Sequence, residues 1–308
     1  MKIGIAGSAD VKATVERCRN LDVTAVYLPV ASLPGYREQG YPDLDTLRAV
    51  KSGLEAEGIE VPSACAWFAK WPVQEGDWRS GRSTDPAIVL RKDRQCMEAM
   101  GRTIEVLGES GIASVLHYVD IGKPDEDVEA CWEALIEMYR ELIPVAEQCG
   151  VGIGNHSLHR LLPDPLREQA VSDGVRLDDY GEFRTGGWGG PFLVDTPEAL
   201  KRLVDAVPSP SNGVTLCTGM DLVGGDVRAL VTQFAEKVHF CQLRDHTDRW
   251  PGGFEVLPGE GRVDLRGVVE ALGAVGYAGI LHPEHLGKPA YEREDRLAKA
   301  VDHVRGLM

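Results

Sequence analysis

The chain has 308 residues and a formal net charge of −15, an acidic balance that disfavours nucleic-acid binding because phosphates are bound by clustered Lys and Arg. It opens on a strand pattern rather than a signal peptide, and its apolar runs are too short to span a membrane, so we expect a cytoplasmic protein without membrane partners. The seven cysteines are odd in number and lack CxxC spacing, which disfavours a disulfide framework and a zinc knuckle.

Short apolar segments alternate with amphipathic ones along the chain. The short segments predict strands at residues 2–6, 23–29, 59–66, 113–118, 151–156, 213–217, 238–245 and 279–285. Helices are predicted from the Ser8-Ala9-Asp10 cap to Arg19, at 43–57, 85–110 and 127–148, from Pro197, and at 265–272 and 291–307. This alternation is typical of a (β/α)8 TIM barrel, so we expect one α/β domain over residues 1–308 with long βα loops.

Three of the connections that follow predicted strands are long. Residues 67–84 contain four aromatic side chains, residues 157–193 are rich in glycine, and residues 245–261 follow the seventh strand. Long loops in compact domains commonly carry function. The segment that begins at Trp67 therefore forms either a packed surface lid or a wall of the substrate pocket, and Trp67 is a candidate substrate-binding residue.

Four predicted strands end in side chains that can bind a metal ion or transfer a proton. They are His156, Cys217, Gln242 and Glu284. The carboxyl ends of barrel strands meet on one side of the fold, so residues from different strands can surround one ion. Imidazole and thiolate ligands suit borderline transition ions and oxygen ligands suit harder ones, so the mixed set favours Mn²⁺, with Fe²⁺, Co²⁺ or Zn²⁺ as alternatives.

Each proposed ligand has an alternative interpretation. Cys217 could be a buried apolar residue of the core. Gln242 is a weak neutral donor that could instead orient substrate hydroxyls, and His159 could replace His156 or face the pocket beside it. Glu284 has the strongest case, because an unpaired carboxylate is costly to bury at an apolar strand end.

Strand periodicity adds a test within the seventh strand. Phe240, Gln242 and Arg244 share one face, whereas His239 and Cys241 share the other. If Gln242 points into the barrel, Arg244 does too, and His239 and Cys241 pack outward against helices.

Several residues near the proposed ligands could bind substrate or catalyse a reaction. Arg244 could bind a carboxylate in bidentate fashion, which points to an acidic sugar-like substrate, or it could form a structural pair with Asp245. His285 is the first choice for acid/base catalysis because imidazole titrates near neutrality. His117 and Tyr118, at the end of the fourth strand, are further candidates.

Several segments of the chain resemble those of mannonate dehydratases of the metal-dependent TIM-barrel type, within the xylose isomerase-like superfamily. The likeness covers most of the chain. The matching segments are residues 43–58, the helix that ends at Gly111-Ile112, and residues 211–219 (SNGVTLCTG), 239–244 (HFCQLR), 261–265 (GRVDL) and 283–285 (PEH). The run from Asn212 to Gly219 is the most specific of them.

The resemblance implies Mn²⁺ ligation by His156, Cys217 and the positions of Gln242 and Glu284. It also implies that Arg244 and His285 bind substrate and transfer protons. The family has histidine where Gln242 stands and aspartate where Glu284 stands. Its His-Pro-Asp-Asp run corresponds to residues 156–159 (HSLH).

We therefore expect a metal-dependent hydro-lyase that dehydrates an aldonic-type sugar acid. The first alternative is a metal-dependent sugar isomerase or epimerase of the same superfamily. The second alternative, motivated by Gln242, is a catalytically degenerate barrel that binds sugar without a metal. The partner is in each case a small sugar or sugar acid, and homo-oligomerisation is left open.

Overall fold

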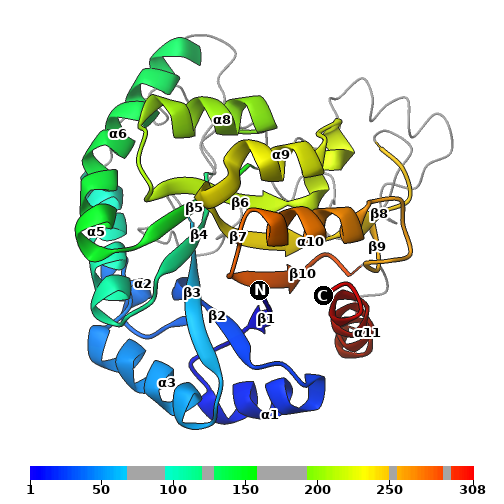
Figure 1. The fold of residues 1–308 in the computed structure, drawn as a ribbon. Coiled ribbons are helices and arrows are strands. Elements are labelled where there is room, and N and C mark those ends of the chain that lie inside the picture. Colours follow the sequence, from blue (N-terminus) through cyan, green and yellow to red (C-terminus); the bar gives the residue numbers. More distant parts are fainter. Residues whose placement is uncertain (68–93, 120–127, 158–192, 250–254, 287–292) are drawn as a thin grey trace, which may run out of the picture.

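The computed structural model describes residues 1–67, 94–119, 128–157, 193–249, 255–286 and 293–308. Within these residues, eight parallel strands close into a barrel in the order β1-β10-β7-β6-β5-β4-β3-β2 (Figure 1). The strands are β1 (Lys2–Ala6), β2 (Ala25–Pro29), β3 (Glu60–Trp67), β4 (Ser114–Tyr118), β5 (Gly152–His156), β6 (Asn212–Cys217), β7 (Val238–Leu243) and β10 (Ile280–Pro283). The predicted (β/α)8 barrel is confirmed.

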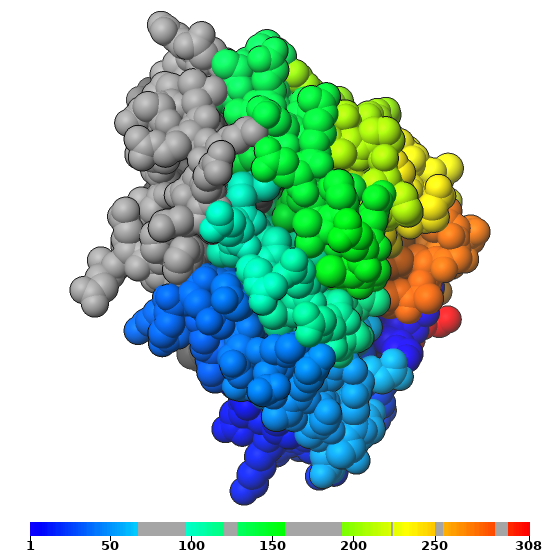
Figure 2. All heavy atoms as spheres, turned by 90° about the vertical axis from the view of Figure 1, so that its left-hand side faces the viewer, coloured from blue at the N-terminus to red at the C-terminus, as the bar shows by residue number. Residues whose placement is uncertain are grey.

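Helices surround the barrel and follow one another around its outside, as the colours running from blue through green show for α3, α5 and α6 in Figure 2. They are α1 (Val11–Leu21), α2 (Tyr36–Gln39), α3 (Leu44–Ala56), α5 (Arg94–Glu109), α6 (Val128–Cys149), α8 (Pro197–Ala206), α9 (Val227–Phe234), α10 (Leu265–Ala274) and α11 (Arg293–Arg305). The last helix packs on β10 and β1, beside the N-terminus (Figure 1). Among the described helices, none has the length and apolar character that a membrane span requires.

Among the residues that the structure describes, five helices begin at a residue whose side chain caps the first turn. Each cap accepts a hydrogen bond from the backbone N–H three residues later, which satisfies one of the N–H groups that a helix start leaves unpaired. The caps are Asp10, Asp43, Thr196, Asp226 and Asp264.

Helix α9 was not among the predicted elements. Its signals are present: Asp226 is the cap, and the buried residues Val227, Leu230, Val231 and Phe234 recur at helical spacing. The predicted loop 245–261 likewise contains a short antiparallel pair, β8 (Asp245–His246) with β9 (Glu255–Val256). This pair follows β7 directly and lies at the carboxyl end of the barrel.

The barrel interior is filled by side chains, not left as a channel. Leu116, Phe240 and Ile280 are buried together there, with Tyr27 packed against them. His282 joins this layer, because its ring lies edge-on to Tyr27 with centroids 4.9 Å apart. The layer forms the floor beneath the polar residues at the strand ends.

The position of His239 differs from the prediction. A register shift between β6 and β7 pairs Val214 with Val238 and Thr215 with Phe240, so His239 is the extra residue of a β-bulge. Its ring lies against the inner face of the barrel and not against the helices. This placement follows from its closeness to Gly152, where an added Cβ would stand 2.6 Å from His239 Nδ1. Cys241 does pack in the outer core, as predicted.

Gly213→Ala is expected to lower the free energy of unfolding by about 1–3 kcal/mol, the usual cost of overpacking. A Cβ at Gly213 would meet the Lys237 carbonyl oxygen and lie 2.6 Å from the His239 ring. Gly101→Ala is the control, because no atom lies within 4 Å of a Cβ there and alanine favours helix α5 by about 0.5–1 kcal/mol. Urea denaturation should thus give shifts of opposite sign, and a stable Gly213→Ala protein would contradict the placement of His239.

Candidate metal centre and active site

The polar strand ends converge at the carboxyl end of the barrel. Tyr118 ends β4 and is opposite His156, which ends β5. Cys217 ends β6 and is opposite Gln242 of β7. Glu284 follows β10, and its backbone N–H donates to Leu243 O at 2.9 Å, which continues the pairing of these strands. The register of the parallel strands therefore brings these five residues, which are far apart in sequence, to the same height along the barrel axis.

Three of these side chains form a group that could hold a metal ion. One potential ligand atom each from His156, Cys217 and Glu284 lies within 4.8 Å of the other two. Ligands of a single transition ion lie at most about twice a bond length apart, roughly 4–5 Å. The distance between the thiol and the carboxylate thus permits both to bind one ion.

The hydrogen bonds of the group suit cation binding. His156 Nδ1 donates to the Ser157 carbonyl at 2.6 Å, which leaves the lone pair of the neutral ring on Nε2, as in many metal-binding histidines. Gln242 Oε1 is buried and accepts no hydrogen bond within the described part of the chain. A buried oxygen without a donor is costly, and a cation would compensate it. The residues present therefore fit a divalent ion.

The pKa values reflect burial balanced by neighbouring charge. Burial, aided by Arg244, lowers the pKa of His156 to about 4, so this ring is neutral at pH 7. Burial would raise the pKa of Glu284, but His285 and Arg244 outweigh it and hold the value at about 2. Burial raises the pKa of the Cys217 thiol to about 11. A bound cation would reverse that shift by favouring the thiolate.

Gln242 and Tyr118 hold the carboxylate of Glu284 from the barrel side. Gln242 Nε2 donates to Glu284 Oε1 at 2.8 Å and to Tyr118 Oη at 3.1 Å. The Tyr118 hydroxyl in turn donates to the same Glu284 oxygen at 3.4 Å. Burial, and then the charge of Glu284, keep the pKa of Tyr118 well above its usual value. Tyr118 is therefore a neutral hydrogen-bonding group.

Arg244 and His285 meet a second carboxylate, that of Glu255. Arg244 Nη1 donates to Glu255 Oε1 at 3.1 Å, and His285 Nδ1 lies 2.7 Å from Glu255 Oε2. Arg244 Nη2 also lies 3.3 Å from Glu284 Oε2. Burial and Arg244 lower the pKa of His285, but the carboxylates of Glu255 and Glu284 outweigh them and raise it overall.

Thr218 and Gly219, which follow β6, hold Arg244 in position. Thr218 Oγ1 accepts from Arg244 N at 2.7 Å and donates to Arg244 O at 2.6 Å. Gly219 leaves room for the side chain, because a Cβ there would stand 2.7 Å from Arg244 Cδ. Gln242 and Arg244 both face the site, as strand periodicity predicts.

Not every predicted residue reaches the site. His117 lies on the outer face of β4, where its Nδ1 is 3.1 Å from Tyr139 Oη of α6 and 3.4 Å from Asn155 Oδ1. Adjacent strand residues point to opposite faces, so Tyr118 points inward and His117 cannot. We exclude His117 from substrate binding. His159 and the side chain of Trp67 lie outside the described residues.

The alternative interpretation, a structural pair of Arg244 with Asp245, is wrong because Asp245 has another role. Its carboxylate accepts from the backbone N–H groups of His246, Gly259, Gly261 and Val263 at 2.8–3.0 Å. These bonds tie the segment after β9 back to the end of β7. Asp245 thus holds the β8–β9 pair in place.

Sequence reasoning missed two residues of this region, Glu255 and His282. Glu255 is a single acidic residue among Phe254, Val256 and Leu257. Apolar neighbours of this kind are a signal of a buried carboxylate. His282 lies two residues before Glu284, and strand periodicity could have placed both on one face.

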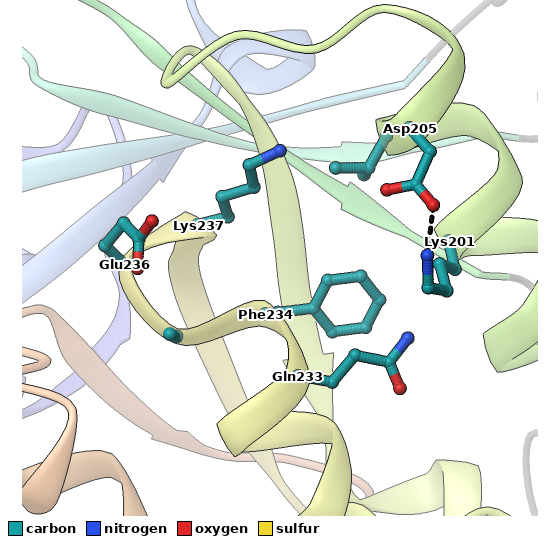
Figure 3. A pocket seen from close by; sticks show the side chains of 8 residues that line it. Lys201, Asp205, Gln233, Phe234, Glu236 and Lys237 are labelled. Carbon is teal, nitrogen blue, oxygen red and sulfur yellow. Dashed lines mark hydrogen bonds and ion pairs between the residues drawn. The ribbon is translucent and has the colours of Figure 1, made fainter.

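A surface hollow lies elsewhere, between α8 and the end of α9 (Figure 3). Its walls include Phe234, the paired Lys201 and Asp205, and Lys237, which precedes β7. It therefore adjoins the end of the barrel where strands begin, opposite to the end where such barrels carry their active sites. We assign it no function.

The fold and the site define a parallel α/β barrel with a cation-capable group at the carboxyl ends of its strands. Comparison with known families agrees: the model of the xylose isomerase-like TIM barrel family matches residues 15–307. The chain belongs to this family.

Curated relatives include proteins named mannonate dehydratase. "Mannonate dehydratase 2" of Agrobacterium fabrum is 34% identical over 209 residues, which cover 63% of this chain and 47% of that protein. The mannonate dehydratase of Chromohalobacter salexigens is 32% identical over 150 residues, or 47% of this chain and 32% of that protein. The chain thus spans less than half the length of these relatives.

Solved structures share the fold at low identity. A mannonate dehydratase from Streptococcus suis superposes with a TM-score of 0.73 at 16% identity, covering 100% of this chain and 93% of the other. A D-psicose 3-epimerase from Clostridium cellulolyticum superposes with a TM-score of 0.68 at 16% identity, covering 100% and 99%. Dehydratases and epimerases are therefore both built on this scaffold.

Proposed function

We propose that this protein is a metal-dependent lyase that removes water from an aldonic-type sugar acid. The observation that carries the proposal is the convergence of His156, Cys217 and Glu284 within 4.8 Å at the carboxyl ends of three strands. The relatives named mannonate dehydratase support it.

His156, Cys217 and Glu284 would hold the ion, and Gln242 would add a neutral oxygen through Oε1. We propose Mn²⁺ because the donors mix imidazole, sulfur and oxygen. When bound, such an ion would chelate the carboxylate and hydroxyl oxygens of the substrate and acidify the proton α to the carboxylate.

The protein's own groups then have defined tasks. His285 holds a proton more readily than an ordinary histidine, so it suits the donation of a proton to the departing β-hydroxyl. A base removes the α proton, the hydroxyl leaves as water with the proton from His285, and the resulting enol becomes a 2-keto-3-deoxy acid. Arg244 would orient the substrate carboxylate, and Tyr118 would hydrogen-bond a substrate oxygen.

One observation favours a second candidate, a sugar isomerase or epimerase. Arg244 is already paired with Glu255 and Glu284, so its charge is partly neutralised before any substrate carboxylate arrives. A neutral ketose needs no such cation. In that reaction the same ion would polarise a carbonyl, and protons would move without loss of water.

Two measurements test these candidates. Protein purified without chelator should carry a transition ion bound to most chains, measured by elemental analysis, whereas a degenerate sugar-binding barrel would carry almost none. Incubation with a panel of aldonic acids should release 2-keto-3-deoxy products. Metal-loaded protein that is inactive on every acid but converts free ketoses would replace the lyase with the epimerase.

A further inference from the structure

We propose that Glu255 is a positioning residue that fixes Arg244 and His285 in one orientation for the reaction, an inference that rests on the proposed function. Neither strand alternation nor the family resemblance assigns a role to this residue. It lies on β9, outside the barrel strands, and reaches the site only because the β8–β9 pair folds back over the end of β7.

The first argument is the division of its two oxygens. Oε1 accepts from Arg244 Nη1 at 3.1 Å, and Oε2 lies 2.7 Å from His285 Nδ1. The three side chains are largely buried, with 10% of Glu255, 6% of Arg244 and 15% of His285 exposed. Hydrogen bonds between charged groups strengthen when water is excluded.

The second argument concerns the His285 ring. A carboxylate can only accept, so Nδ1 carries the proton donated to Glu255. The other nitrogen, Nε2, then lies on the side of Glu284, 3.8 Å from Oε1. The backbone of His285 has a φ of 52°, a left-handed conformation that residues other than glycine rarely adopt. The contact of Nδ1 with Glu255 and the contact of Nε2 with Glu284 together turn Nε2 toward the proposed ion site.

The third argument concerns Arg244. Its guanidinium is shared between Glu255 and Glu284, at 3.1 and 3.3 Å. Without Glu255, Arg244 would keep one carboxylate partner instead of two, and its guanidinium would no longer be held in a fixed position between them. Glu255 therefore fixes the orientation of Arg244 beside the site.

The support of Glu255 is rigid. Register pairs Glu255 with His246, next to Asp245, whose carboxylate accepts one backbone hydrogen bond from His246 and three from the segment after β9. A side chain on this support can orient its partners with little motion, as the groups that orient metal ligands do.

The test compares Glu255→Gln and Glu255→Asp with Asp221→Asn in full-length, Mn²⁺-loaded protein. Asp221 is a matched control because its carboxylate also joins a buried histidine, His246, and an arginine, Arg249, each at 2.9 Å. Glu255→Gln is expected to lower kcat for aldonic-acid dehydration about 10- to 100-fold with unchanged metal content. Glu255→Asp, which keeps the charge, should lose less, and Asp221→Asn should keep kcat within about threefold of wild type.

Equal losses of kcat in Glu255→Gln and Asp221→Asn would overturn the proposal, because they would reflect stability alone. So would loss of the ion from Glu255→Gln. A second readout needs no turnover: NMR of ring-labelled histidines in chelator-treated protein should show a hydrogen-bonded Nδ1–H signal, assigned through His285→Gln, that vanishes in Glu255→Ala, which removes the acceptor. If the signal persists in the variant, the positioning role of Glu255 is refuted, whether or not the wild-type protein dehydrates an acid. If the signal is lost in the variant but the wild-type protein dehydrates no acid, only the proposed lyase activity is refuted.

Discussion

Cys217→Ser is expected to lower metal affinity by more than about 100-fold, beyond the cost of altering a group that merely orients a ligand. Cys217 is fully buried and contributes the sulfur of the cation-capable group. A serine hydroxyl is a poorer ligand for a transition ion than a thiolate. Dehydration should fall with the metal content, while far-UV circular dichroism stays unchanged. Elemental analysis after dialysis and a product assay measure the two effects.

Two further variants test the same metal site: Glu284→Gln should lose the ion, and His239→Asn is the control that should keep it. Glu284→Gln removes the only charged oxygen of the group and should also strip the ion. His239 lies at the start of β7, against Gly152 and Gly213, so its replacement should leave the metal content near wild type even if it costs stability. Wild-type metal content in Cys217→Ser, or loss of metal in His239→Asn alone, would show that the ion is held elsewhere.

The barrel could be predicted because its signals are local and repeated. Each strand is a short apolar run, and caps such as Asp43 mark where the next helix begins. One rule then places the site: parallel strands of a closed barrel end on the same side. His156, Cys217 and Glu284 are far apart in sequence, yet topology alone brings their strand ends together.

The error at His117 came from ignoring a rule that the sequence already contained. His117 and Tyr118 are consecutive in one strand, and the strand period of two forbids both from facing the same pocket. Tyr118 hydrogen-bonds Gln242 and Glu284, so His117 must face helix α6. Applying the period to every strand would have removed it from the candidates.

His239 and Glu255 illustrate what a single sequence does not contain. A β-bulge shifts the phase of β7 at His239, and no residue pattern in that strand announces it. Glu255 reaches the site through a tertiary contact of the β8–β9 pair, which depends on long-range pairing instead of local propensity. Both depend on register, which follows from packing of the whole barrel.

Arg244→Leu is expected to lower the free energy of unfolding of chelator-treated protein by about 3–5 kcal/mol at pH 7, the usual cost of removing one partner of a buried ion pair. Glu255 and Glu284 would then remain as two carboxylates that share a largely buried site without the guanidinium that pairs with both. Arg249→Leu is the matched control, because Arg249 also pairs with a carboxylate, that of Asp221, but is 47% exposed. An exposed pair contributes about 1 kcal/mol or less.

The pH dependence identifies the cause of the Arg244→Leu loss. In the wild type, Glu284 has its pKa lowered from 4.5 to about 2, so its ionised form stabilises the fold above pH 4.5 and this contribution is lost as pH falls toward 2. Arg244 is one of the cations that lower this pKa, so in Arg244→Leu the Glu284 carboxyl should take up a proton at higher pH. The variant's deficit should therefore shrink as pH falls from about 7 to 4. Denaturant unfolding across this range measures it, and a deficit independent of pH would show that Arg244 stabilises the barrel through packing and not through its charge.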